Sequence, residues 1–118
     1  MAKERIYLSA PISAHAVTES GKKERREYFK AYADKLEAVG FRVFNPMENG
    51  LDFCAERAEH MKKDIRELLK CDAIVMLKGW QQSKGCTTEC EVAKAIGLRV
   101  LYESDLAAVL EYGEGGKE

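Results

Sequence analysis

The chain of 118 residues has almost no excess charge and no long apolar run. Lysine and arginine number 19 against 20 aspartates and glutamates, and the net charge of −1 argues against a broad surface for polymeric nucleic acid or an anionic membrane. The longest apolar run covers residues 73–77, and the N-terminus lacks the apolar stretch of a signal peptide. These absences predict a cytoplasmic protein whose partner is a small molecule.

Cysteine and histidine are also few. The four cysteines occur without an export signal, so we expect free thiols rather than a disulfide framework. Cys86 and Cys90 are spaced to supply half of a metal site, but no second pair has CxxC or HxxxH spacing, and His15 and His60 stand alone. We expect no metal and no other cofactor. A metal-binding scaffold through Cys86 and Cys90 is kept as a hypothesis that elemental analysis would decide.

The length leaves no room for a second folded domain. A chain of this size buries roughly 65% of its unfolded surface in one core. The apolar fraction of 46% and the charged fraction of 33% are those of an ordinary globular protein. We therefore expect one domain over residues 1–112 and a flexible tail over residues 113–118, which are rich in glycine and charge.

Apolar spacing predicts strands that alternate with helices. The β-type runs cover residues 5–9, 41–44, 72–77 and 98–102, and the helical patterns cover residues 21–39, 58–70, 86–96 and 104–112. Because crossovers between parallel strands are right-handed, this order predicts a three-layer α/β domain. We expect an open parallel sheet of four to five strands, in the flavodoxin- or Rossmann-like order 2-1-3-4, with helices on both faces.

This topology places a ligand beyond the carboxyl ends of the first and third strands, where the strand order reverses. Residues 10–13 (APIS) follow the first strand, so the sequence has neither GxGxxG nor GxxxxGK[ST] there. A phosphatase cysteine loop and a GxSxG elbow are also missing. The dinucleotide-binding, P-loop and hydrolase-elbow classes are thereby excluded, and a pair of carboxylates remains.

Glu89 is the first of these carboxylates. It shares a helix face with Ala93 and Ile96 and therefore points toward the sheet. A carboxylate near a helix N-terminus, where the dipole favours its ionised form, is suited to act as a nucleophile. The alternative is a structural role in complementing the dipole, or a capping box from Thr88 to Glu91.

For Asp64 and four loop or strand residues, both a functional and a structural role are consistent with the sequence. Asp64 lies at the margin of an apolar helix stripe as a second acid, or is a solvated aspartate. Tyr7 is a phenol at the switch point or a core aromatic. Ser83 and Gly85 form a phosphate cradle before a helix or an ordinary loop. Trp80 stacks on a base or fills a subunit contact.

In their order and spacing, these motifs resemble the nucleoside 2-deoxyribosyltransferase superfamily. The most similar branch is a compact set of bacterial and phage deoxyribosyltransferase-like domains, related to 2′-deoxynucleoside 5′-phosphate N-hydrolases. The resemblance covers about residues 5–102. It rests on residues 6–12 (IYLSAPI), 44–46 (FNP), 64–65 (DI), 71–75 (CDAIV), 79–80 (GW) and 83–85 (SKG), with Glu89 six positions after Ser83.

The resemblance implies an enzyme that cleaves the N-glycosidic bond of a nucleoside or its 5′-monophosphate. Glu89 occupies the position of the nucleophile that forms a covalent sugar ester, and Tyr7 that of the phenol that orients it. Asp64 corresponds to the carboxylate that holds the sugar or assists the leaving base. Water or a second base then releases the sugar, as in a retaining glycosidase.

The resemblance also bears on the substrate. Superfamily transferases of free nucleosides tend to carry an aspartate where this chain has Ser83, whereas the monophosphate hydrolases carry a serine. Those hydrolases have a serine and an arginine after the first strand, where this chain has Pro11 and Ser13, and Ser9, Ser13 or Lys84 would have to compensate. We expect the substrate to contact Ser9, Pro11, Ser13, Trp80, Ser83 and Gly85.

Two further expectations complete the hypothesis. Members of the superfamily commonly assemble as dimers or larger, so the resemblance implies a homodimer or a higher homo-oligomer. The alternative function is a non-catalytic nucleotide-binding or sensing module of the same fold, which would be stabilised by a ligand without releasing a base.

Overall fold

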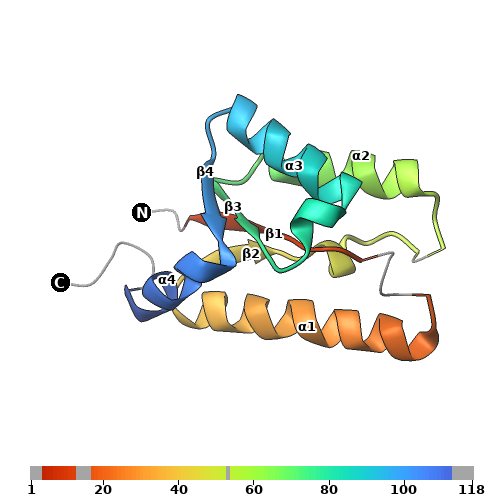
Figure 1. The fold of residues 1–118 in the computed structure, drawn as a ribbon, viewed down its shortest axis with the longest axis horizontal. Helices are drawn as coiled ribbons and strands as arrows, with labels where there is room; N and C mark the ends of the chain where they lie inside the picture. Colours follow the sequence, from red (N-terminus) through yellow and green to blue (C-terminus); the bar gives the residue numbers. More distant parts are fainter. Residues whose placement is uncertain (1–3, 13–16, 53, 113–118) are drawn as a thin grey trace.

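The computed structural model describes residues 4–12, 17–52 and 54–112 of the chain. Residue 13 and residues 113–118, for which a ligand contact and a flexible tail were predicted, lie outside the described residues. The described part contains strands, α-helices and short 3₁₀ turns (Figure 1). They are β1 (Arg5–Ser9), α1 (Glu19–Ala38), β2 (Arg42–Phe44), η1 (Pro46–Glu48), α2 (Arg57–Leu68), β3 (Ala73–Met76), η2 (Trp80–Gln82), α3 (Lys84–Ala95), β4 (Arg99–Tyr102), η3 (Glu103–Asp105) and α4 (Leu106–Tyr112).

The sheet is parallel and has the strand order β2-β1-β3-β4, as the sequence predicts. Strand β1 lies in the interior, where Tyr7 is paired with Phe44 on one side and with Ile74 on the other. The four strands are at the lower end of the predicted range of four to five. Because β1 and β3 are neighbours, the loops that follow them meet at one edge of the sheet.

Helices cover both faces of the sheet, which makes three layers (Figure 1). Helices α1 and α4 pack on the face that Ile6 and Leu8 point toward, and Phe29 and Leu36 fill that core. Helices α2 and α3 pack on the opposite face, where Tyr7 is fully buried. Since side chains alternate along a strand, Tyr7 and Ser9 point toward the same face and therefore toward α3.

The observed boundaries agree with the predicted ones to within two residues. Helix α3 begins at Lys84, before its predicted start at Cys86, because the Ser83 hydroxyl accepts a hydrogen bond from the Cys86 N–H at 3.2 Å. Helix α1 also begins early, because Thr18 Oγ1 accepts from the Gly21 N–H at 2.9 Å. Of the helices in the described part of the chain, none has the length and apolar content needed to cross a membrane.

Candidate active site

The carboxylate of Glu89 lies between α3 and β1, with a hydroxyl donor on each oxygen. The Tyr7 phenol donates to Oε2 at 2.7 Å, and the Ser9 hydroxyl donates to Oε1 at 2.8 Å. Glu89 is only 7% exposed. Tyr7 and Ser9 are alternate residues of one strand and thus reach the same carboxylate from the same face. The inward orientation predicted for Glu89 is therefore observed.

Burial controls the protonation of this group. Loss of solvation is the main cause that raises the pKa of Glu89, and the charge of Asp64 adds to it, whereas the Tyr7 and Ser9 hydrogen bonds oppose it; the net pKa is about 7. Burial also raises the pKa of Tyr7 well above its ordinary value, so the phenol keeps its proton and remains a donor. The site thus holds a carboxylate that changes charge near neutral pH.

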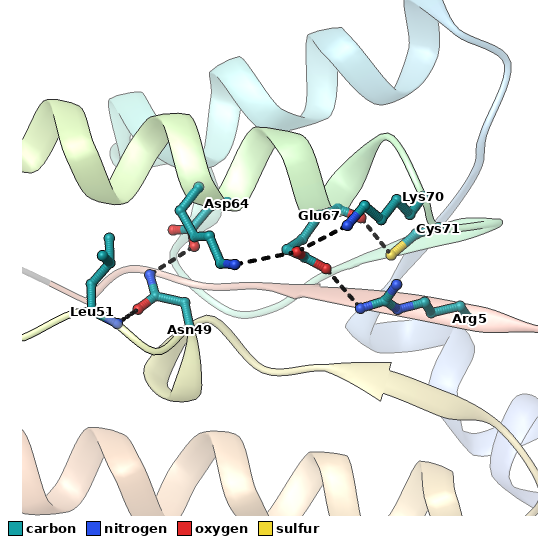
Figure 2. A network of polar contacts seen from close by, with 8 residues as sticks. Arg5, Asn49, Leu51, Asp64, Glu67, Lys70 and Cys71 are labelled. Atoms are coloured by element: carbon teal, nitrogen blue, oxygen red, sulfur yellow. Dashed lines mark hydrogen bonds and ion pairs between the residues drawn. The ribbon is translucent and has the colours of Figure 1, made fainter.

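Asp64 of α2 is the second acid of the site. It is 8% exposed, and its Oδ1 accepts a hydrogen bond from Asn49 Nδ2 at 2.9 Å (Figure 2). Burial raises the pKa of Asp64, and the Asn49 hydrogen bond limits that rise. The charge of Asp64 contributes to the raised pKa of Glu89, so the charge state of Asp64 affects the protonation of Glu89.

A cavity of about 420 Å³ opens beside Asp64, whereas Glu89, Tyr7 and Ser9 are not among the described residues that line it. Asp64 lines it directly, and so do Ala10 and Cys86, which lie one residue after Ser9 and one helical turn before Glu89. Ile12, Met47, Leu51 and Met61 give the cavity an apolar wall. The volume and the mixture of apolar and polar walls are suited to a small amphipathic ligand.

Basic side chains border the same cavity. Arg26 of α1 and Arg57 of α2 line it, and both are exposed. His60, on the same helix as Arg57, lines it as well. Two guanidinium groups at the mouth of a cavity favour an anionic ligand, because each offers several N–H donors and a permanent charge.

The loop residues predicted to contact substrate are divided between two places. Ser83 and Gly85 line the cavity, and the Ser83 hydroxyl is already used to cap α3. A side chain on Gly85 would place its Cβ 3.2 Å from Met61 Cε, so glycine preserves space here. Trp80 instead packs against Tyr102, with ring centroids 5.9 Å apart, and is not among the described residues that line the cavity.

Pro11 is buried behind the cavity wall. Its carbonyl oxygen accepts a hydrogen bond from Arg25 Nη1 at 3.0 Å, and its ring lies where a Cβ on Gly79 would approach to 3.2 Å. Gly79 has φ +88°, which favours glycine. Pro11 and Gly79 thereby bring the loop after β1 into contact with the loop after β3. Pro11 is not among the described residues that line the cavity.

The comparison with known proteins agrees with this architecture. Residues 4–102 match a family described as Domain of unknown function (DUF4406). The chain belongs to the DUF4406 family. No curated protein matches the sequence.

The DUF4406 chain shares its fold with a solved enzyme structure. That structure is the 2-desoxiribosyltransferase from Leishmania mexicana, with a TM-score of 0.63 and 19% sequence identity. The match covers 84% of this chain and 63% of that chain, so the DUF4406 chain spans less than two thirds of the length of its neighbour. The fold implied by the resemblance to the deoxyribosyltransferase superfamily is therefore confirmed.

Four residues of this DUF4406 site were missed from the sequence. Arg26, Asn49, Arg57 and His60 all line the cavity, with Arg26 on α1, Asn49 just after η1, and Arg57 and His60 on α2. A weak signal existed for two of them, because Asn49 follows the FNP turn and His60 lies one helical turn before Asp64. For the arginines, the sequence has many similar exposed cations, and only the three-dimensional structure shows that Arg26 and Arg57 line the cavity.

Cys86 and Cys90 are the remaining candidates for metal binding or nucleophilic chemistry near the site. Cys86 and Cys90 are buried free thiols, and among the described residues no group of three or more His, Cys, Asp or Glu side chains is placed to hold a metal ion. Burial raises the pKa of Cys86, although this thiol lines the cavity. A protonated thiol is a weak nucleophile, so the carboxyl pair is the stronger candidate for the chemistry.

Proposed function

We propose that this DUF4406 protein cleaves the N-glycosidic bond of a deoxynucleoside 5′-monophosphate or nucleoside through a covalent intermediate on Glu89. The observation that carries the proposal is a buried carboxylate that is held by Tyr7 and Ser9 and whose pKa is affected by Asp64 beside a cavity. The fold shared with a solved deoxyribosyltransferase supports the same chemistry.

The proposed reaction uses the two carboxyl groups in different protonation states. Glu89, ionised, attacks the anomeric carbon and forms a sugar ester, while the carbon–nitrogen bond to the base breaks. Asp64, protonated, gives its proton to the leaving base. Asp64 then accepts a proton from water, which attacks the same carbon and releases Glu89. The proposal places the negative charge on Glu89, which the Tyr7 and Ser9 hydrogen bonds favour, and the proton on Asp64, whose pKa burial raises.

Tyr7 and Ser9 prepare the nucleophile. Their hydroxyl groups donate to the two oxygens of Glu89, and both hydrogen bonds favour the ionised form that the attack requires. They also fix the plane of the carboxylate, so that little reorganisation is needed when the sugar ester forms. We assign Tyr7 and Ser9 this role within the proposal.

The decisive experiment measures free base. Purified protein is incubated with a panel of nucleosides and 5′-monophosphates, and released base is detected by chromatography. Glu89→Gln is expected to abolish release, and Glu91→Gln is the matched control, because Glu91 lies on the same helix and is exposed. Intact protein mass after rapid quenching should show the sugar adduct. The proposal is wrong if no substrate releases base or if Glu89→Gln remains fully active.

The two cavity arginines favour the monophosphate over the nucleoside. Arg26 and Arg57 are placed to pair with a phosphate, whereas the Ser83 hydroxyl is committed to the helix cap. We expect Arg26→Gln and Arg57→Gln each to raise the KM for a monophosphate about tenfold and to leave the KM for the nucleoside unchanged. Arg66→Gln, an exposed change on α2, is the control.

The alternative is a nucleotide-binding or sensing module without turnover. A rise in melting temperature with a nucleotide, in the absence of any base release, would select it. Added acceptor base distinguishes transfer from hydrolysis, because transfer yields a new nucleoside. We also propose a cytoplasmic homodimer or higher homo-oligomer, which light scattering and cell fractionation would test.

A further inference from the structure

The side chain of Asn49 contacts His60, Asp64 and the backbone N–H of Leu51 beside the cavity. Asn49 lies just after η1, is 7% exposed, and contacts both Asp64 and His60 through its side-chain amide. Nothing in the proposed reaction uses this residue or the histidine. Both line the cavity that Asp64 also lines.

The orientation of the Asn49 amide is fixed by its own loop. Oδ1 accepts a hydrogen bond from the backbone N–H of Leu51 at 3.0 Å. The amide nitrogen must therefore face the other way, where Asp64 Oδ1 lies at 2.9 Å (Figure 2). A flipped amide would set its NH₂ group against the Leu51 N–H and its oxygen against the carboxylate.

The same amide determines which ring nitrogen of His60 carries the hydrogen. Asn49 Nδ2 lies 3.1 Å from His60 Nδ1, and an NH₂ group only donates, so Nδ1 must accept. His60 Nε2 lies 3.1 Å from the carbonyl oxygen of Asp52, which only accepts, so Nε2 must carry the hydrogen. The contacts on both sides thus agree on one neutral tautomer.

We infer that Asn49 is a positioning residue for Asp64: it holds Oδ1 as a hydrogen-bond acceptor and leaves Oδ2 to carry the proton for the leaving base. His60, in its Nε2–H tautomer, occupies the second N–H of the Asn49 amide and keeps the amide from turning away from Asp64. The catalytic part of this inference rests on the proposed function, whereas the tautomer does not.

Other groups also act on Asp64 and must be considered in any pH experiment. Glu89 of α3 and Tyr7 of β1 face it from neighbouring elements, and His60, Lys63 and Glu67 act on it from its own helix. Asn49 is distinct among these partners, because it donates a hydrogen bond directly to Oδ1 of Asp64. Its removal therefore raises the pKa of Asp64 without changing the net charge of the site.

Kinetics of Asn49→Ala test the positioning role, with Asn45→Ala as the matched control. Asn45 is a buried asparagine of the same segment, but its side chain accepts from the Met47 N–H and caps η1. We expect Asn49→Ala to lower kcat about 10- to 100-fold with little change in KM, and to move the alkaline limb of the pH profile upward. Asn45→Ala should keep the wild-type pH profile. Equal kcat values and unchanged profiles in both variants would overturn the inference.

Nitrogen NMR tests the tautomer without any substrate. The chain has two histidines, so His60→Gln assigns the imidazole signals of ¹⁵N-histidine-labelled protein. We expect His60 near neutral pH to show an unprotonated Nδ1 and a protonated Nε2, and Asn49→Ala to mix the two tautomers. A protonated Nδ1 in the wild type would contradict the network even if the enzyme is active. Absence of base release with the expected spectrum would contradict only the catalytic assignment.

Discussion

Asp64 and Glu67 lie on the same helix, about one turn apart, and each is 8% exposed, yet their pKa values are shifted in opposite directions (Figure 2). Burial raises the pKa of Asp64. Burial acts on Glu67 in the same sense, but hydrogen bonds and charge from Lys70 and Arg5 outweigh it and lower the pKa. The exposed fraction of a residue therefore does not by itself determine the pKa of its carboxyl group in this protein.

The difference lies in the partners. Glu67 is paired with three cations: Arg5 at 2.8 Å, Lys70 at 3.4 Å and Lys63 at 3.6 Å. Asp64 accepts from a neutral amide and faces the cavity. The last turn of α2 is thus joined to β1 by compensated charge, and one turn earlier the helix holds an acid whose pKa is raised. This contrast is typical of a structural group beside a functional one.

The largest expected effect, which tests the functional role of Asp64 against the structural role of Glu67, is on turnover. Asp64→Asn removes the proton donor for the leaving base, so we expect base release to fall by about 10²- to 10⁴-fold. Thermal stability should be kept or increased, because the change removes a buried carboxyl group that has no ion pair with the described residues. Single-turnover chromatography and thermal denaturation give the two readouts. Loss of folding instead of loss of rate would show that Asp64 is structural.

The next effect is on the pH dependence of the free energy of unfolding, and it tests the raised pKa of Glu89. An acid whose folded pKa is raised contributes most below its unfolded pKa and loses that contribution as the pH rises through the folded value. For Glu89 this window runs from 4.5 to about 7. We expect Glu89→Gln to match wild-type stability near pH 4 and to exceed it by roughly 3 kcal/mol above pH 7. Denaturant unfolding across this range measures it, and a constant difference would contradict the raised pKa.

Glu67→Gln tests the opposite case, a carboxyl group whose pKa is lowered. A folded pKa below the unfolded value gives stability that is present above the unfolded pKa and is lost as the pH falls through the folded one. We expect a loss of about 2 kcal/mol at pH 7 that shrinks in acid, since the change leaves Arg5 without its carboxylate partner. Base release should stay at the wild-type rate. Glu59→Gln, an exposed change in the first turn of α2, is the control.

The smallest effect distinguishes the ion pairs that Lys70 and Arg5 form with Glu67. Lys70 is 61% exposed, against 27% for Arg5, so its ion pair with Glu67 is well screened by solvent. We expect Lys70→Ala to cost about 0.5 kcal/mol and this cost to vanish in high salt. Arg5→Ala should cost more and should respond less to salt. Equal costs would show that burial does not rank these pairs.

The fold was predictable because local signals and topology agree. Periodicity located each strand and helix, and the rule of right-handed crossovers predicted helices on both faces of a parallel sheet. The inward orientation of Glu89 followed from its helical spacing to Ala93. The early start of α3 was missed, because Gly85 weakens a helix signal and the cap formed by the Ser83 hydroxyl depends on backbone geometry.

The site was only partly predictable. Tyr7, Asp64 and Glu89 stand in regular elements, where the period indicates the direction of a side chain. Asn49 lies in an irregular segment, and its role depends on an amide orientation that the Leu51 N–H imposes in three dimensions. The charged partners of the two acids could not be predicted either. Asp64 and Glu67 have the same lysines near them in the chain, and only the packing of α2 on β1 brings Arg5 to Glu67.

The position of β1 has a consequence for how this domain can change over evolution. Its two hydroxyl groups reach Glu89 because Tyr7 and Ser9 share a register, and pairing with β2 and β3 on both edges fixes that register. A slip by one residue would turn both hydroxyl groups to the opposite face. The hydrogen bonds to Glu89 are therefore inherited with the sheet, and new specificity in descendants should arise from the cavity loops.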